Sequence, residues 1–311
     1  MKVSIIIPTY RRQQFIRRAI RSALEQKNVE VEVIVVDDNG LGSEYQKSNF
    51  EELKSFIENK QITYIAHKHN KNGSAARNTG LSKATGDFIA FLDDDDEFEP
   101  NKIYEQIKTM NIDSSDACLS TFARVYGDKV TKITTPKIDA DFPVKLLAVN
   151  VDTCAGSCLI LRKKLIDKIG LFDESFSRFQ DLEYLYRVSK MTEISVATSS
   201  KTNINMHDGN IKHRPAADIL EYHKHFLQTF QSDINQCGRI NKQYILDQHY
   251  IKISKSYIKE KNFIKGLMWS FRTSNPIKSS TIIISDFIKY ILNLKLKKAI
   301  VPTKEKYVVE H

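Results

Sequence analysis

The stretch FIAFLDDDD at residues 88–96 joins five apolar residues directly to four adjacent aspartates. A continuous apolar run of this length is typical of a strand that is covered on both faces within an α/β sheet. Open sheets of this class bind ligands at the carboxyl ends of their strands. An Asp-rich string taken alone favours a solvated loop, but its position after a buried strand predicts that residues 93–96 line a crevice.

The four aspartates also call for a cation, because adjacent carboxylates repel one another when they are removed from bulk water. Carboxylate oxygens in a row suit Mg²⁺ or Mn²⁺, which reach a protein through one or two carboxylates plus waters and substrate phosphates. The stretch therefore predicts a site for Mn²⁺ or Mg²⁺ and a diphosphate substrate.

The chain on either side alternates apolar strands with helical patterns, which predicts an α/β fold with a mostly parallel central sheet flanked by helices. The chain is long enough, at 311 residues, for one large domain with an appendage. We expect an α/β domain over residues 1–210 and a mainly helical, basic region over residues 211–311. Strands are predicted at residues 3–7, 31–36, 62–66, 88–92, 117–125 and 158–161, and helices at 15–24, 74–83, 100–110 and up to Ile169.

The four cysteines of the chain lack paired CxxC spacing, and no signal sequence is recognised ahead of them. We expect reduced thiols in a cytoplasmic protein. Cys154 and Cys158 have no nearby histidine or second cysteine pair to complete a tetrahedral zinc site, which favours ordinary packing for both.

Positive charge is concentrated in the last third of the chain. Residues 210–311 hold 18 Lys and Arg against 8 Asp and Glu, a net charge of +10, and the formal charge of the whole chain is +9. This asymmetry indicates a polyanionic partner, either nucleic acid or an anionic membrane surface. Residues 281–300 show an amphipathic pattern with several lysines, which predicts a helix that lies on a membrane or packs on the α/β domain.

Three further groups of polar residues stand at the ends of predicted strands or helices. Residues 8–12 (PTYRR) offer a hydroxyl, a ring and two cations, and residues 37–40 (DDNG) offer an aspartate that could accept the N3 proton of uracil or cap a helix. Residues 73–80 (GSAARNTG) let a backbone approach a phosphate, while Arg77 can neutralise that phosphate or pair with the aspartates. The last group lacks the Gly-Lys-Ser/Thr of nucleoside triphosphatases, which disfavours that activity.

One more acidic residue stands at the start of a predicted helix. Asp181 lies where the helix dipole favours the ionised carboxylate, as a general base requires. A simple helix-capping role is the alternative for this aspartate.

Taken together, these groups resemble the family-2 glycosyltransferases of the GT-A fold. The resemblance extends in order over residues 1–210. Each motif is weak alone, and their order and spacing are specific. The motifs that carry the resemblance are SIIIPTY at residues 4–10, VVDD at 35–38, GSAARNTG at 73–80, FLDDDD at 91–96, GLFDE at 170–174 and Gln180-Asp181.

The resemblance implies roles for residues outside the aspartate run. Thr9, Tyr10 and Asp38 would hold the uridine of a nucleotide sugar, with Asp38 at the edge of the base. Arg77 would support the diphosphate region, and Asp181 would be the catalytic base. The chain departs from the family pattern at Gln180, where glutamate is frequent, and at Gly40, where serine is common.

Within the run, Asp93 and Asp95 correspond to the first and last acids of the family's DxD motif, with Asp93 near the ribose and Asp95 on the metal. Asp94 fills the variable middle position on the nucleotide-sugar side, and Asp96 extends the metal end. His207 stands where some members supply a later metal ligand, although a lone histidine is often a structural hydrogen-bonding residue.

The implied activity is a metal-dependent, inverting transfer of a sugar from a UDP-sugar. Chain length and the DDDD form of the motif are also similar to bacterial O-antigen glucosyltransferases that extend GlcNAc-diphospho-undecaprenol through a β-1,3 bond. This implies glucose as the donor sugar, a polyprenyl-diphosphate-linked saccharide as the acceptor and peripheral association with the inner face of the cell membrane. UDP-galactose, UDP-GalNAc and UDP-GlcNAc stay open as donors.

Two other classes of protein compete with this interpretation. A non-catalytic protein that binds nucleic acid or membrane would explain the basic region but not residues 93–96 or Asp181. A sugar nucleotidyltransferase would carry a Gly-rich, basic triphosphate loop near its N-terminus, and residues 8–12 do not form one. We therefore expect an enzyme that does not bind nucleic acid.

Overall fold

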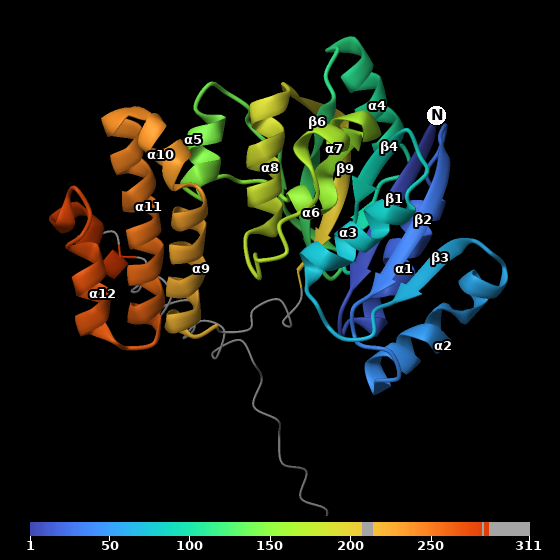
Figure 1. The fold of residues 1–311 in the computed structure, drawn as a ribbon, viewed down its shortest axis with the longest axis horizontal. Coiled ribbons are helices and arrows are strands. Elements are labelled where there is room, and N and C mark those ends of the chain that lie inside the picture. Colours follow the sequence, from blue (N-terminus) through green and yellow to red (C-terminus); the bar gives the residue numbers. More distant parts are fainter. Residues whose placement is uncertain (207–213, 282, 286–311) are drawn as a thin grey trace, which may run out of the picture. The chain divides into compact units, whose positions relative to one another are not determined.

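The computed structural model describes residues 1–206, 214–281 and 283–285, and the chain divides into two compact units, Met1–His213 and Arg214–His311. Unit 1 is an α/β structure, and the described part of unit 2 is helical (Figure 1).

The described part of unit 1 is built on a nine-stranded sheet with the order β3-β2-β1-β4-β8-β6-β9-β5, and β7 pairs with β6 outside this path. The strands β3, β2, β1 and β4 are parallel to one another, whereas β8 runs antiparallel to both β4 and β6. The strands are β1 (Lys2–Thr9), β2 (Glu30–Asp37), β3 (Ile62–Ala66), β4 (Phe88–Phe91), β5 (Glu97–Phe98), β6 (Ala117–Tyr126), β7 (Lys129–Thr134), β8 (Leu159–Arg162) and β9 (Ile194–Asn205).

Helices cover both faces of this sheet (Figure 1). Apolar side chains of α1, α2 and α4 form one core with alternate residues of β1, β2 and β4. On the opposite face, α8 packs through Tyr184 against Phe91 of β4, and α3 approaches β1 closely. The helices are α1 (Gln13–Leu24), α2 (Glu44–Glu58), α3 (Gly73–Lys83), α4 (Lys102–Ile112), α5 (Phe142–Leu147), α6 (Ala155–Cys158), α7 (Lys163–Ile169) and α8 (Gln180–Met191).

The close approach of α3 to the sheet depends on a glycine. A Cβ atom on Gly80 would lie 2.4 Å from Cγ2 of Ile6, a side chain in the middle of β1. No real Cβ atom tolerates such a contact, so any larger residue would push α3 away from the strand. The spacing of small residues in 73–80 thus sets the distance between helix and sheet.

The sequence-based predictions of the strands agree with β1 to β4, β6 and β8 to within a few residues at their ends. The predicted helix ending at Ile169 is α7, and Gly170 follows it with φ of 78°, a left-handed conformation that favours glycine. The strands β5, β7 and β9 were not predicted, and β9 runs parallel to β6 and antiparallel to β5.

The described part of unit 2 contains α9 (Ala216–Thr229), α10 (Gln231–Gln236), α11 (Gly238–Lys259) and α12 (Phe263–Ser270), and residues 276–281 and 283–285 are also helical. A small apolar cluster links α9 to α11 and includes Trp269 of α12. The predicted amphipathic helix at residues 281–300 lies almost entirely outside the described residues.

Candidate active site

The sheet topology brings the polar groups of the sequence to one edge. Thr9 is in register with Asp37, Asp37 is in register with Ala66, and Ile6 is in register with Phe91. Because β1 to β4 are parallel, their carboxyl ends face the same side, where ligands bind in folds of this class. The loops after these four strands therefore form one candidate site.

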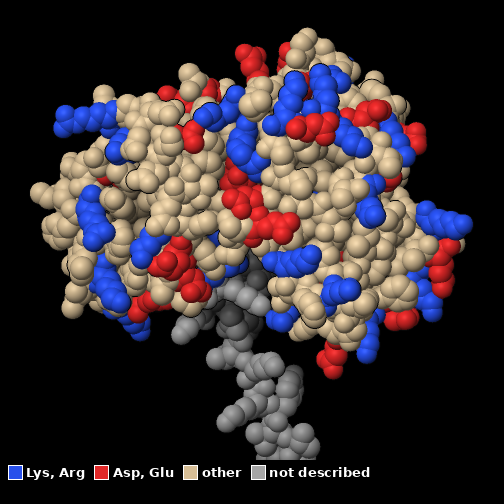
Figure 2. All heavy atoms as spheres, in the orientation of Figure 1, with Lys and Arg blue, Asp and Glu red and all other residues tan. Residues whose placement is uncertain are grey.

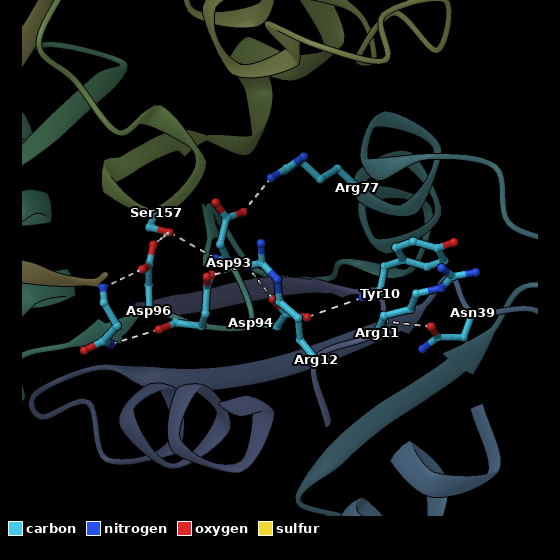
Figure 3. Close-up of polar contacts among 11 residues, drawn as sticks. Tyr10, Arg11, Arg12, Asn39, Arg77, Asp93, Asp94, Asp96 and Ser157 are labelled. Atoms are coloured by element: carbon cyan, nitrogen blue, oxygen red, sulfur yellow. Dashed lines mark hydrogen bonds and ion pairs between the residues drawn. The ribbon is translucent and has the colours of Figure 1, made fainter. Parts of the chain in front are cut away.

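Asp93 is held in an ion pair that connects two other parts of the site. The Nη2 of Arg77 donates to Asp93 Oδ1 over 2.7 Å (Figure 3), and its Nη1 donates to Gln180 Oε1 over 3.2 Å. Of the two roles left open for this arginine, the structure has it pairing with an aspartate of the run. Gln180 opens α8, so Arg77 links the aspartate run to the helix that carries Asp181.

Two glycines make this linkage possible. A Cβ atom on Gly73 would lie 2.7 Å from Gln180 Oε1, and one on Gly156 would lie 2.8 Å from Asp93 Oδ2. Both distances are too short for a real side chain. The backbone of α3 and α6 can therefore come close to the polar groups only because these positions lack a side chain.

Arg12 is the cation nearest to the middle of the run. Its Nη1 lies 3.4 Å from Asp94 Oδ1 and forms a shorter ion pair with Asp95 Oδ2. The backbone N–H of Tyr10 also donates to Asp94, so this carboxylate fixes the loop after β1 (Figure 3). Burial raises the pKa of Asp94 to about 7, although the neighbouring Arg12 acts in the opposite direction.

Asp96 points to a different set of partners. Ser157 Oγ donates to Asp96 Oδ2 over 2.6 Å, and the backbone N–H of Asn205 donates to its Oδ1 over 3.1 Å (Figure 3). Ser157 Oγ in turn accepts the backbone N–H of Asp93. Burial and the nearby carboxylates of Asp93 and Asp95 raise the pKa of Asp96 well above its usual range. This aspartate braces the run against α6 and β9.

The carboxylate of Asp38 is buried and accepts four hydrogen bonds from one loop. Its Oδ1 lies 2.7 Å from His67 Nδ1 and accepts the N–H of Lys71, while its Oδ2 accepts from the Asn70 amide and the N–H of Asn72. These partners fill the acceptor positions of a carboxylate. A uracil ring could reach this oxygen pair only if one of the loop donors moved away.

Thr9 and Tyr10 offer a different kind of surface. The hydroxyl oxygen of Thr9 is buried and finds no hydrogen-bond partner among the described residues. Tyr10 is exposed, and the guanidinium of Arg11 lies 4.9 Å from the centre of its ring. The same hydroxyl lies close enough to the Asp94 carboxyl to lower its pKa, so a ligand at the exposed ring would meet a polar group that is linked to the aspartate run.

Asp181 lies in the first turn of α8 and lines a small pocket together with Arg77, Phe91, Gly156, Phe172 and Tyr184. The described residues offer its carboxylate no hydrogen bond or ion pair. A half-buried carboxylate of this kind keeps its lone pairs available for an incoming hydroxyl.

The structure adds partners that the sequence did not identify. Arg12 was noted as one of two cations but received no role, and Ser157 and Asn205 stood in segments without a motif. Nothing local could identify Ser157 or Asn205, because they reach Asp96 across gaps of 61 and 109 residues in the chain. His207 lies outside the described residues.

The described residues contain neither a metal-binding cluster nor a helix that could span a membrane. Within residues 1–206, 214–281 and 283–285, no three His, Cys, Asp or Glu side chains converge as a metal site. No helix in these ranges is long and apolar enough to cross a membrane.

Comparison with known proteins identifies the family. The family model described as Glycosyl transferase family 2 matches residues 4–170, more than half of the chain. The chain belongs to glycosyl transferase family 2. The matched range includes the loops with Thr9, Asp38, Arg77 and the aspartate run, and it ends before Asp181.

The alignments with two relatives extend over only part of each relative's length. An uncharacterized glycosyltransferase of Rickettsia felis is 29% identical over 203 residues, which are 62% of this chain and 32% of the relative. The GalNAc(5)-diNAcBac-PP-undecaprenol beta-1,3-glucosyltransferase of Campylobacter jejuni is 39% identical over 97 residues, 31% of this chain and 30% of that protein. The chain thus spans about a third of these relatives.

Solved structures agree on the fold. TarS of S. aureus, residues 1–349 in complex with UDP-GlcNAc, superposes with a TM-score of 0.57 at 18% identity and covers 86% of this chain and 89% of that one. GalNAc-T7 with UDP, GalNAc and Mn²⁺ gives a TM-score of 0.60 at 12% identity, covering 84% of this chain and 53% of that one. The expected GT-A fold of the glycosyltransferases is confirmed.

Proposed function

We propose that this family-2 glycosyltransferase transfers glucose from UDP-glucose to a polyprenyl-diphosphate-linked saccharide with inversion at the anomeric carbon. The observation that carries the proposal is the position of Asp181. Its carboxylate lines the same pocket as Arg77, and Arg77 pairs with the first aspartate of the DxD motif. The proposed base, which would act on the acceptor hydroxyl, and a residue linked to the donor-binding aspartates thus line the same pocket.

The nucleotide would bind across the loops after β1, β2 and β4. Thr9 and Tyr10 supply a buried hydroxyl and an exposed ring for the uridine. Asp38 would reach the base edge if it exchanged one of its four loop donors for the N3–H of uracil. Asp93 and Asp94 would face the ribose and the diphosphate, and Arg77 would neutralise phosphate charge.

The residues present fit a divalent metal that is bound together with the diphosphate. Mn²⁺ and Mg²⁺ need only one or two protein carboxylates when phosphate oxygens complete the shell. Asp95 would be the direct ligand, and Asp96, already engaged by Ser157 and Asn205, would support it. When bound, the metal would stabilise negative charge on the departing UDP. His207 stays a predicted additional ligand.

The chemical step proposed for this chain is a single displacement. Asp181 takes the proton of the acceptor hydroxyl, whose oxygen forms a bond to the anomeric carbon. The bond between that carbon and the β-phosphate oxygen breaks, and UDP leaves with the bonding pair. Attack from the opposite face converts an α-linked donor into a β-linked product.

The acceptor and the linkage are proposed from two weaker supports. The Campylobacter relative is named for transfer to an undecaprenyl-diphosphate-linked saccharide through a β-1,3 bond, and residues 210–311 carry a net charge of +10. A positively charged region suits an enzyme that works at the anionic inner face of a cell membrane. We propose GlcNAc-diphospho-undecaprenol as acceptor in surface-polysaccharide (O-antigen) synthesis, with UDP-galactose, UDP-GalNAc and UDP-GlcNAc as alternative donors.

The test is a transfer assay with purified full-length protein. UDP-glucose and the three alternative UDP-sugars are each offered with a GlcNAc-diphospho-lipid analogue, with Mn²⁺, Mg²⁺ or a chelator. We expect metal-dependent UDP release and a β-1,3-linked disaccharide by NMR with one donor. Transfer to a different hydroxyl would correct the linkage.

If none of the four UDP-sugars were hydrolysed or transferred and the protein bound RNA tightly at physiological salt, the result would favour a non-catalytic nucleic-acid-binding protein.

A further inference from the structure

Helix α12 exposes an apolar face. Ile264, Leu267, Met268 and Phe271 recur at i, i+3, i+4 and i+7, which places them on one side of the helix. All four are exposed, and Ile264 and Phe271 retain 76% and 66% of their accessible surface. Single exposed apolar residues are ordinary, but a contiguous apolar face on a helix indicates an interaction surface.

The opposite face of α12 is firmly packed. Gly266 and Ser270 are buried, and a Cβ atom on Gly266 would lie 2.4 Å from Cγ1 of Ile258 in α11. Ser254 Oγ of α11 donates to the Gly266 carbonyl over 2.6 Å. This close packing fixes the rotation of α12 about its axis, so its apolar side faces outward in the folded unit.

The segment that carries this face is basic, and acidic residues lie at its borders: Glu260 precedes it, and Asp247 of α11 accepts hydrogen bonds from Ser274. Residues 261–285 contain Lys261, Lys265, Arg272 and Lys278, and they contain no Asp or Glu. Figure 2 shows Lys and Arg side chains beside uncharged surface over the helices of unit 2, together with a separate cluster of Asp and Glu side chains. Long basic side chains can extend from the border of an apolar face to reach anionic groups.

We propose that the outward face of α12 docks onto an anionic lipid leaflet. An interfacial helix places Leu, Ile and Phe side chains among the acyl chains near the headgroups while Lys and Arg contact anionic headgroups. Charge complementarity supports this occupant, because the segment that carries the face, residues 261–285, holds four cations and no acid. The inference deepens the proposed function and rests on it for its purpose, since it holds the enzyme near a lipid-linked acceptor.

The chain contains its own probe for the test, because its one tryptophan, Trp269, lies on α12. Its ring is half-buried, with the ring of Tyr250 at 5.6 Å and the Arg272 guanidinium at 4.4 Å. Full-length protein is mixed with vesicles of phosphatidylcholine alone or with phosphatidylglycerol. We expect flotation with the anionic vesicles only, and quenching of Trp269 emission when the acyl chains are brominated.

Three double variants distinguish binding through this surface from non-specific adsorption. Ile264→Ser with Phe271→Ser removes the two most exposed residues, one at each end of the face, and should weaken vesicle binding at least about tenfold. Leu41→Ser with Ile112→Ser removes two residues of unit 1 that are 64% and 72% exposed, and should leave binding unchanged. Lys265→Gln with Arg272→Gln should weaken binding to anionic vesicles about tenfold and flatten its dependence on lipid charge.

Equal loss in both serine variants, or flotation without any quenching of Trp269, would overturn the assignment to α12. A dimer that the Ile264 and Phe271 changes dissociate, without vesicle binding by the original chain, would identify a second copy as the occupant and also overturn it. The vesicle assay needs neither UDP-sugar nor transfer, so its failure is distinguishable from failure of the proposed glycosyltransfer.

Discussion

The loops at the carboxyl ends of β1 to β4 and the outward face of α12 differ in which side chains they expose to solvent. The first region buries charged side chains and gives them partners, as with Asp38, Asp94 and Asp96. The second exposes apolar side chains that the described residues leave uncovered. Buried charged side chains with partners are typical of a catalytic or binding site, whereas an exposed apolar surface is typical of an interaction surface.

The largest expected effect lies in the first region. Asp181→Asn removes the proposed proton acceptor but preserves the shape of the side chain, so transfer should fall by about 10²-fold or more. Binding of UDP-sugar, measured by titration calorimetry, should stay close to the original, and so should flotation with anionic vesicles. Asp167→Asn, an exposed aspartate on α7, is the matched control.

Near-normal turnover by the Asp181 variant would remove this residue from the role of base. A loss of vesicle binding in the same variant would instead show that the active-site loops and the face of α12 do not act independently.

The second prediction divides the aspartate run. Asp95→Ala should weaken Mn²⁺ binding in the presence of UDP by about 100-fold or more, because a direct ligand is lost. Asp94→Ala should have a smaller effect on Mn²⁺ and a larger one on UDP, since Asp94 holds the N–H of Tyr10. Electron paramagnetic resonance of Mn²⁺ measures the first quantity and calorimetry the second. The reverse order would shift the assumed register of the metal motif.

A third prediction concerns the cation within the site. Arg12 pairs with Asp94 and Asp95, so a metal on Asp95 must displace the guanidinium. Arg12→Gln should therefore tighten Mn²⁺ binding without nucleotide by about fivefold, the effect of one half-exposed ion pair. Arg11→Gln is the control, because Arg11 lies over the rings of Tyr10 and Tyr45. Weaker binding by the Arg12 variant would mean that this arginine assists the metal.

The smallest expected effect is a pH dependence of stability without metal. Burial raises the pKa of Asp94 to about 7, so the folded state favours the protonated acid. That contribution is complete below the ordinary aspartate pKa of about 4 and is lost as the pH rises through 7. The Tm of the original chain should therefore fall by a few degrees relative to Asp94→Asn between pH 5 and 8. A constant Tm difference would show that Asp94 is already ionised at pH 5.

The apolar strands and the residues that follow them could be read from the sequence because their patterns are local. Phe88–Leu92 is a continuous apolar run and Val3–Ile7 is interrupted only by Ser4, and the GT-A fold followed from the order of the motifs around them. The partners of Asp96 could not be read, since Ser157 and Asn205 come to it only through the pairing of β8, β6 and β9.

The sequence by itself determined which residues sit at the ends of parallel strands, because the alternation of apolar runs and polar motifs sets both strand and loop. Only the tertiary structure decided which charges meet. Arg77 could have faced a phosphate or Asp93, and it pairs with Asp93 because Gly73 and Gly156 let α3 and α6 approach. The apolar residues of α12 could have been core or surface, and the packing of Gly266 on Ile258 turned them outward. Local patterns fix where a side chain starts, and packing between distant segments fixes what it contacts.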